Sequence, residues 1–167
     1  GGYHGDTLGA MSAGDVDDFT GVFRPLLFDV QRPPDAIDHH WEPVFERLFA
    51  LLRAGADQIA GVIVEPVVQG AAGMRTSDPA YRRHARELCD RHDVLLVFDE
   101  VATGYGRTGP MWACEHAGVA PDLLCTAKGF TGGMLPMAAT LVSERVFDGF
   151  LGAPERAFYY GHTFCGN

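Results

Sequence analysis

The sequence lacks the features that mark several large classes of protein. No apolar run approaches the ~20 residues of a membrane-spanning helix, and the start has no basic and apolar segment of the kind that directs secretion. The four cysteines show neither CxxC pairing nor metal-ligand spacing, which favours free thiols over disulfides. Repeats and low-complexity tracts are missing too. We therefore expect a cytoplasmic protein without membrane spans.

Positive charge is scarce as well. Thirteen Lys and Arg residues stand against 22 Asp and Glu, which gives a net charge of −9 with histidines neutral. A surplus of this size argues against binding to nucleic acid or to an anionic membrane surface. His39-His40 has no third ligand at metal spacing, so no metal site is expected. The composition is otherwise globular, 47% hydrophobic and 21% charged, and 167 residues suffice for one domain with a core.

Both ends of the sequence resemble cuts through functional loops. The chain opens on Gly1-Gly-Tyr-His4 without a methionine and stops at Gly161-His-Thr-Phe-Cys-Gly-Asn167 without a terminating element. We therefore expect residues 1–167 to be an internal fragment of a longer protein.

Helix and strand patterns alternate along the chain. Residues 15–43 are expected to be rich in loops, because Arg32-Pro-Pro34 blocks regular structure. The alternation predicts an α/β fold with a mostly parallel sheet covered by helices on both faces. Helices are expected over 5–14, 42–54, 78–91, 111–117 and 144–151, and strands over 59–65, 94–99, 123–127 and 136–143. The first helix should begin near Asp6 and Thr7, and Asp78 and Ser143 should cap the helices that follow them.

Three ionisable residues fall at the predicted carboxyl ends of strands, where such sheets bind ligands: Glu65, Asp99 and Lys128. Lys128 ends an apolar run, and burial against apolar surface lowers the pKa of an amine. A neutral amine can form a Schiff base with an aldehyde cofactor. A buried carboxylate such as Asp99 needs a partner, and a protonated pyridine nitrogen is one. The pair predicts a site for pyridoxal phosphate.

Two other nucleotide-binding patterns are incomplete. Val94–Glu100 also matches the strand and acid that hold magnesium in P-loop nucleotidases, but the G-x-x-x-x-G-K-[ST] loop does not occur in this chain. Gly104-Tyr-Gly-Arg-Thr-Gly109 spells G-x-G-x-x-G, yet two acids separate it from the strand and Pro110 follows it. We expect these glycines to shape a loop beside the active site.

Two weaker patterns lie near the ends of the chain. Tyr3 stands beside a polar turn and could stack on a planar cofactor, although a packed tyrosine explains the pattern as well. Gly161-His-Thr163 offers a hydroxyl and backbone amides that suit a phosphate, although taken alone it is only a turn.

Taken together, these motifs resemble the class III pyridoxal-phosphate aminotransferases. The resemblance covers essentially the whole chain, and both order and spacing agree, with 29 residues from Asp99 to Lys128 and 35 from Lys128 to Thr163. It implies the large domain of a fold-type-I enzyme, with an amino-terminal segment and a carboxyl-terminal small domain outside residues 1–167. The motifs are Tyr3-His-Gly-Asp-Thr7, Val64-Glu-Pro-Val-Val-Gln-Gly70, Phe98-Asp-Glu-Val-Ala-Thr-Gly-Tyr-Gly-Arg-Thr-Gly109, Ala127-Lys-Gly129 and Gly161-His-Thr-Phe164.

The resemblance also assigns roles toward the cofactor. Lys128 is expected to carry pyridoxal phosphate covalently and then to move the proton between cofactor and substrate. Asp99 is expected to pair with the pyridine nitrogen, with Val101 against one face of the ring and Tyr3 against the other. Thr163 is expected to bind the cofactor phosphate of the partner subunit, which implies a homodimer with shared active sites.

Toward the substrate, the resemblance points to Tyr3, Asp6, Arg107 and Gly161. Several details are similar to class members that act in biotin synthesis: Tyr3-His-Gly-Asp-Thr7, Val68-Gln-Gly-Ala-Ala-Gly-Met74, Ala113-Cys-Glu-His116 and Lys128-Gly-Phe-Thr-Gly-Gly133. This implies amino transfer to 8-amino-7-oxononanoate, giving 7,8-diaminononanoate, with S-adenosylmethionine as donor, although some relatives use lysine. The alternatives are a class III transaminase for ω-amino acids or diamines, or a non-catalytic piece of a dimer interface. The fragment alone is expected to be inactive.

Overall fold

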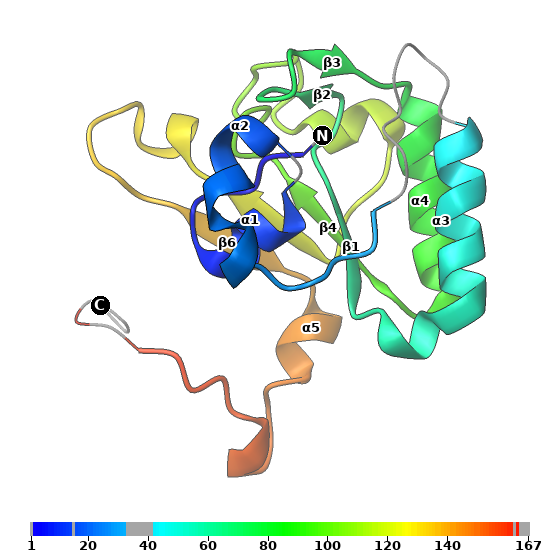
Figure 1. Ribbon diagram of the computed structural model, residues 1–167. Helices are drawn as coiled ribbons and strands as arrows, with labels where there is room; N and C mark the ends of the chain where they lie inside the picture. Colours follow the sequence, from blue (N-terminus) through cyan, green and yellow to red (C-terminus); the bar gives the residue numbers. More distant parts are fainter. Residues whose placement is uncertain (1, 15, 33–41, 162, 164–167) are drawn as a thin grey trace.

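The computed structural model describes residues 2–14, 16–32, 42–161 and 163. A four-stranded sheet in the order β1-β4-β5-β6 lies at its centre, and a small hairpin, β2-β3, stands beside it (Figure 1). The strands are β1 (Gly61–Val64), β2 (Val68–Gln69), β3 (Arg75–Thr76), β4 (Leu95–Asp99), β5 (Leu123–Thr126) and β6 (Ala139–Val142).

In the described residues, five α-helices and five short 3-10 helices connect or cover the strands. The longest have 14 residues, and no helix in the described part of the chain is long and apolar enough to cross a membrane. The α-helices are α1 (Leu8–Ala13), α2 (Asp17–Thr20), α3 (Glu42–Gly55), α4 (Pro79–His92) and α5 (Glu144–Asp148). The 3-10 helices are η1 (Gly21–Leu26), η2 (Ala56–Gln58), η3 (Ala113–Ala117), η4 (Lys128–Thr131) and η5 (Pro154–Arg156).

The expected α/β fold with a mostly parallel sheet is confirmed. β4 runs parallel to both β1 and β5, whereas β6 pairs antiparallel with β5. Helix starts lie close to where local chemistry placed them: the Thr7 side chain accepts a hydrogen bond from the Ala10 amide at 3.4 Å, and Asp78 accepts one from Ala80 at 2.6 Å. Both are N-caps, which satisfy amides that a helix leaves free at its first turn.

Some local expectations were wrong. Residues 17–26, taken for loop, form α2 and η1, and Asp17 and Asp18 in the first turn of α2 favour the positive end of the helix dipole. The β2-β3 hairpin was not expected. Ser143 stands at the start of α5, but its hydroxyl makes no capping hydrogen bond. Residues 33–41, part of the expected loop, lie outside the described residues.

The core fills one face of the sheet. Leu96 and Phe98 of β4 are fully buried against α4, and Leu124 of β5, the register partner of Phe98, lies on the same face. α3 stands beside α4 on this side (Figure 1). Because side chains alternate along a strand, the residues between these point away from the helices. The core cluster is Leu48, Leu52, Ala85, Leu88, Cys89, Val94, Leu96, Phe98, Cys114 and Leu124.

The opposite face is only partly covered. Val97, Leu123 and Cys125 are half-buried there, and the amino-terminal segment with α1 lies on this side (Figure 1). Two residues of that segment fix it to the carboxyl ends of the strands, because Tyr3 contacts Glu65 and His4 contacts Asp99. The polar residues at the carboxyl ends of the strands therefore lie on the open face.

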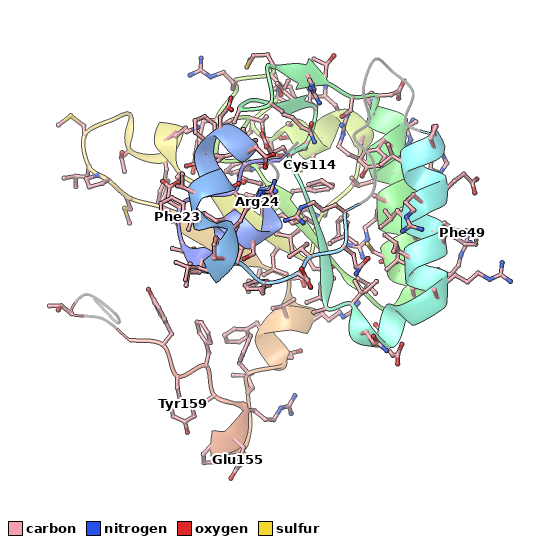
Figure 2. The ribbon with its side chains drawn as sticks, viewed as in Figure 1. Phe23, Arg24, Phe49, Cys114, Glu155 and Tyr159 are labelled. Atoms are coloured by element: carbon pink, nitrogen blue, oxygen red, sulfur yellow. The ribbon has the colours of Figure 1, made fainter. Side chains whose placement is uncertain are left out.

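After α5 the chain leaves the sheet as an arm over residues 149–161, which contains η5 (Figure 1). Its aromatic rings pack on one another, with centroids 5.5 Å apart for Phe150 and Phe158 and 5.6 Å for Phe158 and Tyr160. All three rings are exposed, and the side chains of the arm stand clear of the sheet in Figure 2. These two ring contacts are thus made within the arm.

Candidate active site

Asp99 and Lys128 lie at the same edge of the sheet. Asp99 is the last residue of β4, and its register partner in β5 is Cys125. Lys128 comes three residues later, as the first residue of the turn η4. Because β4 and β5 are parallel neighbours, both residues lie at the carboxyl edge, where α/β sheets bind ligands.

The Asp99 carboxylate is oriented by two partners. Its Oδ2 lies 2.8 Å from Nδ1 of His4, and its Oδ1 accepts a hydrogen bond from the Val101 amide at 3.0 Å. The side chains of His4 and Asp99 are 6% and 8% exposed, so the pair is buried. An ionised carboxylate offers about four acceptor sites, and these contacts use two. Asp99 can therefore accept a further N–H, as a protonated pyridine nitrogen requires.

His4 was missed by the sequence reasoning. The signal was present, because His4 stands inside the motif from which only Tyr3 and Asp6 received roles. Its partner lies 95 residues away in the chain, and no local pattern reports a contact of that range. The structure adds His4 to the site as the side chain that fixes Asp99.

Glu100, the neighbour of Asp99, has a structural role. It is fully buried, and three donors surround its carboxylate: the Thr103 hydroxyl at 2.5 Å, the Ala113 amide at 3.0 Å and the Cys114 amide at 2.8 Å. Glu100 therefore closes the loop over residues 101–112 onto the end of β4.

A buried arginine offsets the Glu100 charge. Burial lowers the pKa of Arg82 to about 10, while the nearby carboxylates of Asp78 and Glu100 act in the opposite direction. The guanidinium donates to the Ser77 hydroxyl at 2.8 Å and to the Ser77 carbonyl at 3.2 Å. A buried charge is tolerated when an opposite charge and hydrogen bonds accompany it.

Glu65 holds the end of β1 to two neighbours. Its Oε1 accepts a hydrogen bond from the Tyr3 amide at 2.8 Å, and its Oε2 accepts one from the Gly70 amide at 2.9 Å. Glu65 thus ties the amino-terminal segment and the turn after β2 to the same edge of the sheet that carries Asp99.

The expected burial of Lys128 was wrong. Its side chain is exposed, because the apolar run ends at Ala127 and the following Met134 and Leu135 are themselves exposed. Its backbone is unusual, with φ 43° in the left-handed region, a conformation that costs a non-glycine residue about 1–2 kcal/mol. Lys128 is also the only lysine among the 167 residues, a signal that the sequence reasoning overlooked.

Tyr3 and Asp6 lie together near the polar edge. The Tyr3 hydroxyl donates to Asp6 Oδ1 at 2.7 Å, and this hydrogen bond is the main reason why the pKa of Tyr3 is raised. The Tyr3 ring meets Phe19 edge to face, with centroids 5.5 Å apart. Tyr3 and Asp6 flank His4, the residue of this segment that contacts Asp99.

The remaining expected site residues are spread more widely. Val101 is half-buried and bound through its amide to Asp99, whereas Arg107 is exposed on the loop that Glu100 closes. Gly161 and Thr163 are exposed, and Gly161 is the last residue of the arm that leaves the sheet in Figure 1. Within one chain, the structure thus gathers the expected residues of the amino-terminal segment, β4 and η4 but leaves those of the arm apart.

The fold and this edge define a class of enzyme. The chain belongs to the class III aminotransferases, since the family model described as "Aminotransferase class-III" matches residues 1–167. It is 48% identical to the adenosylmethionine-8-amino-7-oxononanoate aminotransferase of Nitratidesulfovibrio vulgaris over 99% of this chain and 33% of that protein. With the protein of the same name from Geobacter sulfurreducens the identity is 45%, over 99% of this chain and 39% of the relative.

Solved structures agree with the fold. The crystal structure of adenosylmethionine-8-amino-7-oxononanoate aminotransferase from Methanocaldococcus jannaschii matches with a TM-score of 0.89 and 39% identity, over 98% of this chain and 38% of that one. A transaminase from the marine bacterium Virgibacillus matches with a TM-score of 0.82 and 30% identity, over 98% and 37%. The chain spans well under half the length of the relatives it matches.

Proposed function

We propose that this chain forms the cofactor-binding part of a cytoplasmic, pyridoxal-phosphate-dependent aminotransferase. The reaction would move an amino group onto 8-amino-7-oxononanoate, giving 7,8-diaminononanoate for biotin synthesis, with S-adenosylmethionine as the donor. The observation that carries the proposal is the carboxylate of Asp99, oriented by His4 at the end of β4, beside the single lysine at the end of β5. The names of the relatives support the choice of substrates.

The residues at the edge suit the cofactor. Asp99 would accept the N–H of the pyridine ring and hold its proton, while His4 and the Val101 amide keep the carboxylate in place. Lys128 would hold the cofactor through Nζ and would move the proton to and from the substrate carbon. Pyridoxal phosphate, when bound, supplies the electron sink for the carbanion at that carbon.

The flanking residues would position ring and substrate. Val101 would pack on one face of the ring, since its amide is tied to Asp99, and Tyr3 on the other, since its amide is tied to Glu65. Asp6, already bonded to the Tyr3 hydroxyl, and Arg107 on the adjacent loop would contact the substrate.

The arm would act on a second subunit. The arm that ends at Gly161 leaves the sheet of its own chain in Figure 1, which supports a homodimer in which Thr163 binds the phosphate, and Gly161 the substrate, at the partner's site. Mixing a Lys128→Ala protein with a Thr163→Ala protein should restore activity, because half of the sites in a heterodimer then carry neither change. No recovery under subunit exchange would refute the shared site.

The proposal is tested in the longest reading frame that contains this chain. Borohydride reduction with pyridoxal phosphate, followed by peptide mapping, should place the label on Lys128, and Lys128→Ala should abolish turnover. A label elsewhere would refute the assignment. A panel of acceptors and donors then decides the substrate, because activity on ω-amino acids or diamines but not on 8-amino-7-oxononanoate would place the protein elsewhere in the class.

A further inference from the structure

The backbone of Lys128 raises a question that the proposed function leaves open. A non-glycine residue persists in the left-handed region only where its surroundings hold it there, and Lys128 has φ 43°. Lys128 is exposed, so the restraint comes from the turn that follows, in which the Phe130 amide donates to the Ala127 carbonyl at 3.0 Å. Among the described residues, the Tyr105 side chain packs on this turn.

The Tyr105 ring lies against Gly129 and Phe130. A Cβ built on Gly129 would stand 2.9 Å from Cδ2 of Tyr105, closer than real Cβ contacts allow. The Phe130 ring is stacked on the Tyr105 ring, with centroids 6.1 Å apart and planes 19° apart. Gly129 and Phe130, directly after Lys128, therefore both pack on the Tyr105 ring.

The other side of Tyr105 is anchored to the end of β4. Its ring meets Trp112 edge to face at 5.0 Å, and Trp112 approaches Gly104 so closely that a Cβ there would lie 2.7 Å from the indole. Glu100 fixes this segment through the amides of Ala113 and Cys114, which follow Trp112 directly. The Tyr105 ring is thus held by Trp112 and, through the segment after it, by the buried Glu100, which directly follows Asp99.

We propose that Tyr105 is a positioning residue for Lys128: its ring, braced by Trp112 and Glu100, holds the turn Lys128–Phe130 so that the amine stands in a fixed relation to Asp99. The inference rests on the proposed function, since it concerns how that site is assembled. Tyr105 would touch neither cofactor nor substrate in this role. Its effect is to keep the turn at the end of β5 in register with the end of β4.

The first test uses the protein without cofactor, in the longest reading frame that contains this chain. Tyr105→Leu should speed hydrogen exchange of the amides at residues 130–134 by about tenfold, because a local opening becomes easier when packing is lost. Tyr105→Phe keeps the ring and should stay within about twofold of wild type. Exchange in α4 serves as the internal control and should not change. Unchanged exchange at 130–134 in Tyr105→Leu would overturn the proposal.

The second test probes the contact from the other side. Gly129 lies outside the left-handed region, so Gly129→Ala adds a methyl group against the ring without backbone strain. It should slow attachment of pyridoxal phosphate to Lys128 by about tenfold, since small misplacements of a reacting group are costly, and it should shift the pH midpoint of the visible absorbance band. Tyr105→Leu removes the ring but keeps Cβ and Cγ, which would lie 3.2 and 3.3 Å from the added methyl, so Gly129→Ala should have a smaller effect in that background than beside the ring.

The outcomes separate this inference from the proposed function. An equal effect of Gly129→Ala with and without the Tyr105 ring would overturn the positioning role, even in a protein that binds the cofactor normally. If wild type does not bind pyridoxal phosphate at all, the proposed function fails, and the exchange experiment alone then decides whether Tyr105 holds the turn.

Discussion

On the face of the sheet that carries α3 and α4, Leu96, Phe98 and Leu124 are buried among apolar side chains, whereas on the opposite face Leu123 and Cys125 are half-buried beside the Asp99 carboxylate. One strand, β4, supplies both environments by alternation. The closed face gains its free energy from packing, and the open face keeps polar atoms within reach of a ligand.

The same contrast separates two adjacent carboxylates. Glu100 is enclosed by three donors and has a structural role, while Asp99 is held by two and retains acceptor sites. Two acids that look equivalent in the sequence thus differ in what their surroundings leave free. Substitutions on each side should separate stability from activity.

The largest effect is expected on the closed face. Phe98→Ala should lower the free energy of unfolding by about 3–5 kcal/mol, the usual cost of a large cavity. The control is Val97→Ala on the open face of the same strand, where a half-buried side chain should cost about 1 kcal/mol. Denaturant unfolding of the longest reading frame measures both, and equal losses would show that the two faces do not differ in packing.

Asp99→Asn should lower activity and leave stability nearly unchanged. It keeps the shape and one acceptor oxygen, so unfolding should change little, while the rate of amino transfer should fall by about 10²–10³-fold through loss of the charge that holds the ring proton. Steady-state kinetics beside thermal unfolding give the two readouts. A rate within about threefold of wild type, well short of that range, would mean that Asp99 is only structural.

Glu100→Gln sharpens the contrast between the neighbours. The new amide must point an N–H group toward a backbone N–H, either of Ala113 or of Cys114, and a buried donor without an acceptor costs about 1–3 kcal/mol. We expect that loss in the free energy of unfolding. The opposite result, unchanged stability with lower activity, would assign Glu100 to the chemistry.

The smallest effect concerns a carboxylate on the border of the core. Burial alone would raise the pKa of Asp122, but the Leu96 amide and Arg86, both at 2.8 Å, hold it below its ordinary value of 3.8. A lowered folded-state pKa stabilises the fold above 3.8, and that contribution is lost as the pH falls through the folded value. Asp122→Asn should therefore cost about 1–2 kcal/mol at neutral pH.

Denaturation of both proteins from pH 7 downward checks this prediction. The difference between wild type and Asp122→Asn should shrink below pH 3.8, where the wild-type carboxylate becomes protonated. Asp90→Asn is the matched control, because Asp90 pairs with the same Arg86 but is 62% exposed, and such surface pairs contribute only about 0–1 kcal/mol. A difference that does not depend on pH would contradict the assigned cause.

Much of the fold could be predicted because its signals are local. The apolar runs of β4 and β5 and the caps at Thr7 and Asp78 each lie within a few residues, and their alternation indicated a parallel sheet. The antiparallel direction of β6 and the two-residue strands of the hairpin left no such trace, since an alternating pattern carries no direction and β2 is too short to show a period.

The site was harder to predict, because its geometry depends on distant partners. Sequence reasoning placed Asp99 and Lys128 at strand ends, and the structure puts them there. It did not find His4, which meets Asp99 across 95 residues, and it expected Lys128 to be buried. Burial is decided by what covers a strand end, and in the described residues the turn after Lys128 is itself exposed.

A single lysine among 12 arginines has a practical consequence. A protease that cleaves only after lysine cuts these 167 residues once, separating the segment through Lys128, with Asp99 and its supports, from β6 and the arm. Any adduct on the amine blocks that cut. The fraction of chain that survives digestion after reduction therefore counts occupied sites directly, without a chromophore and without knowledge of the substrate.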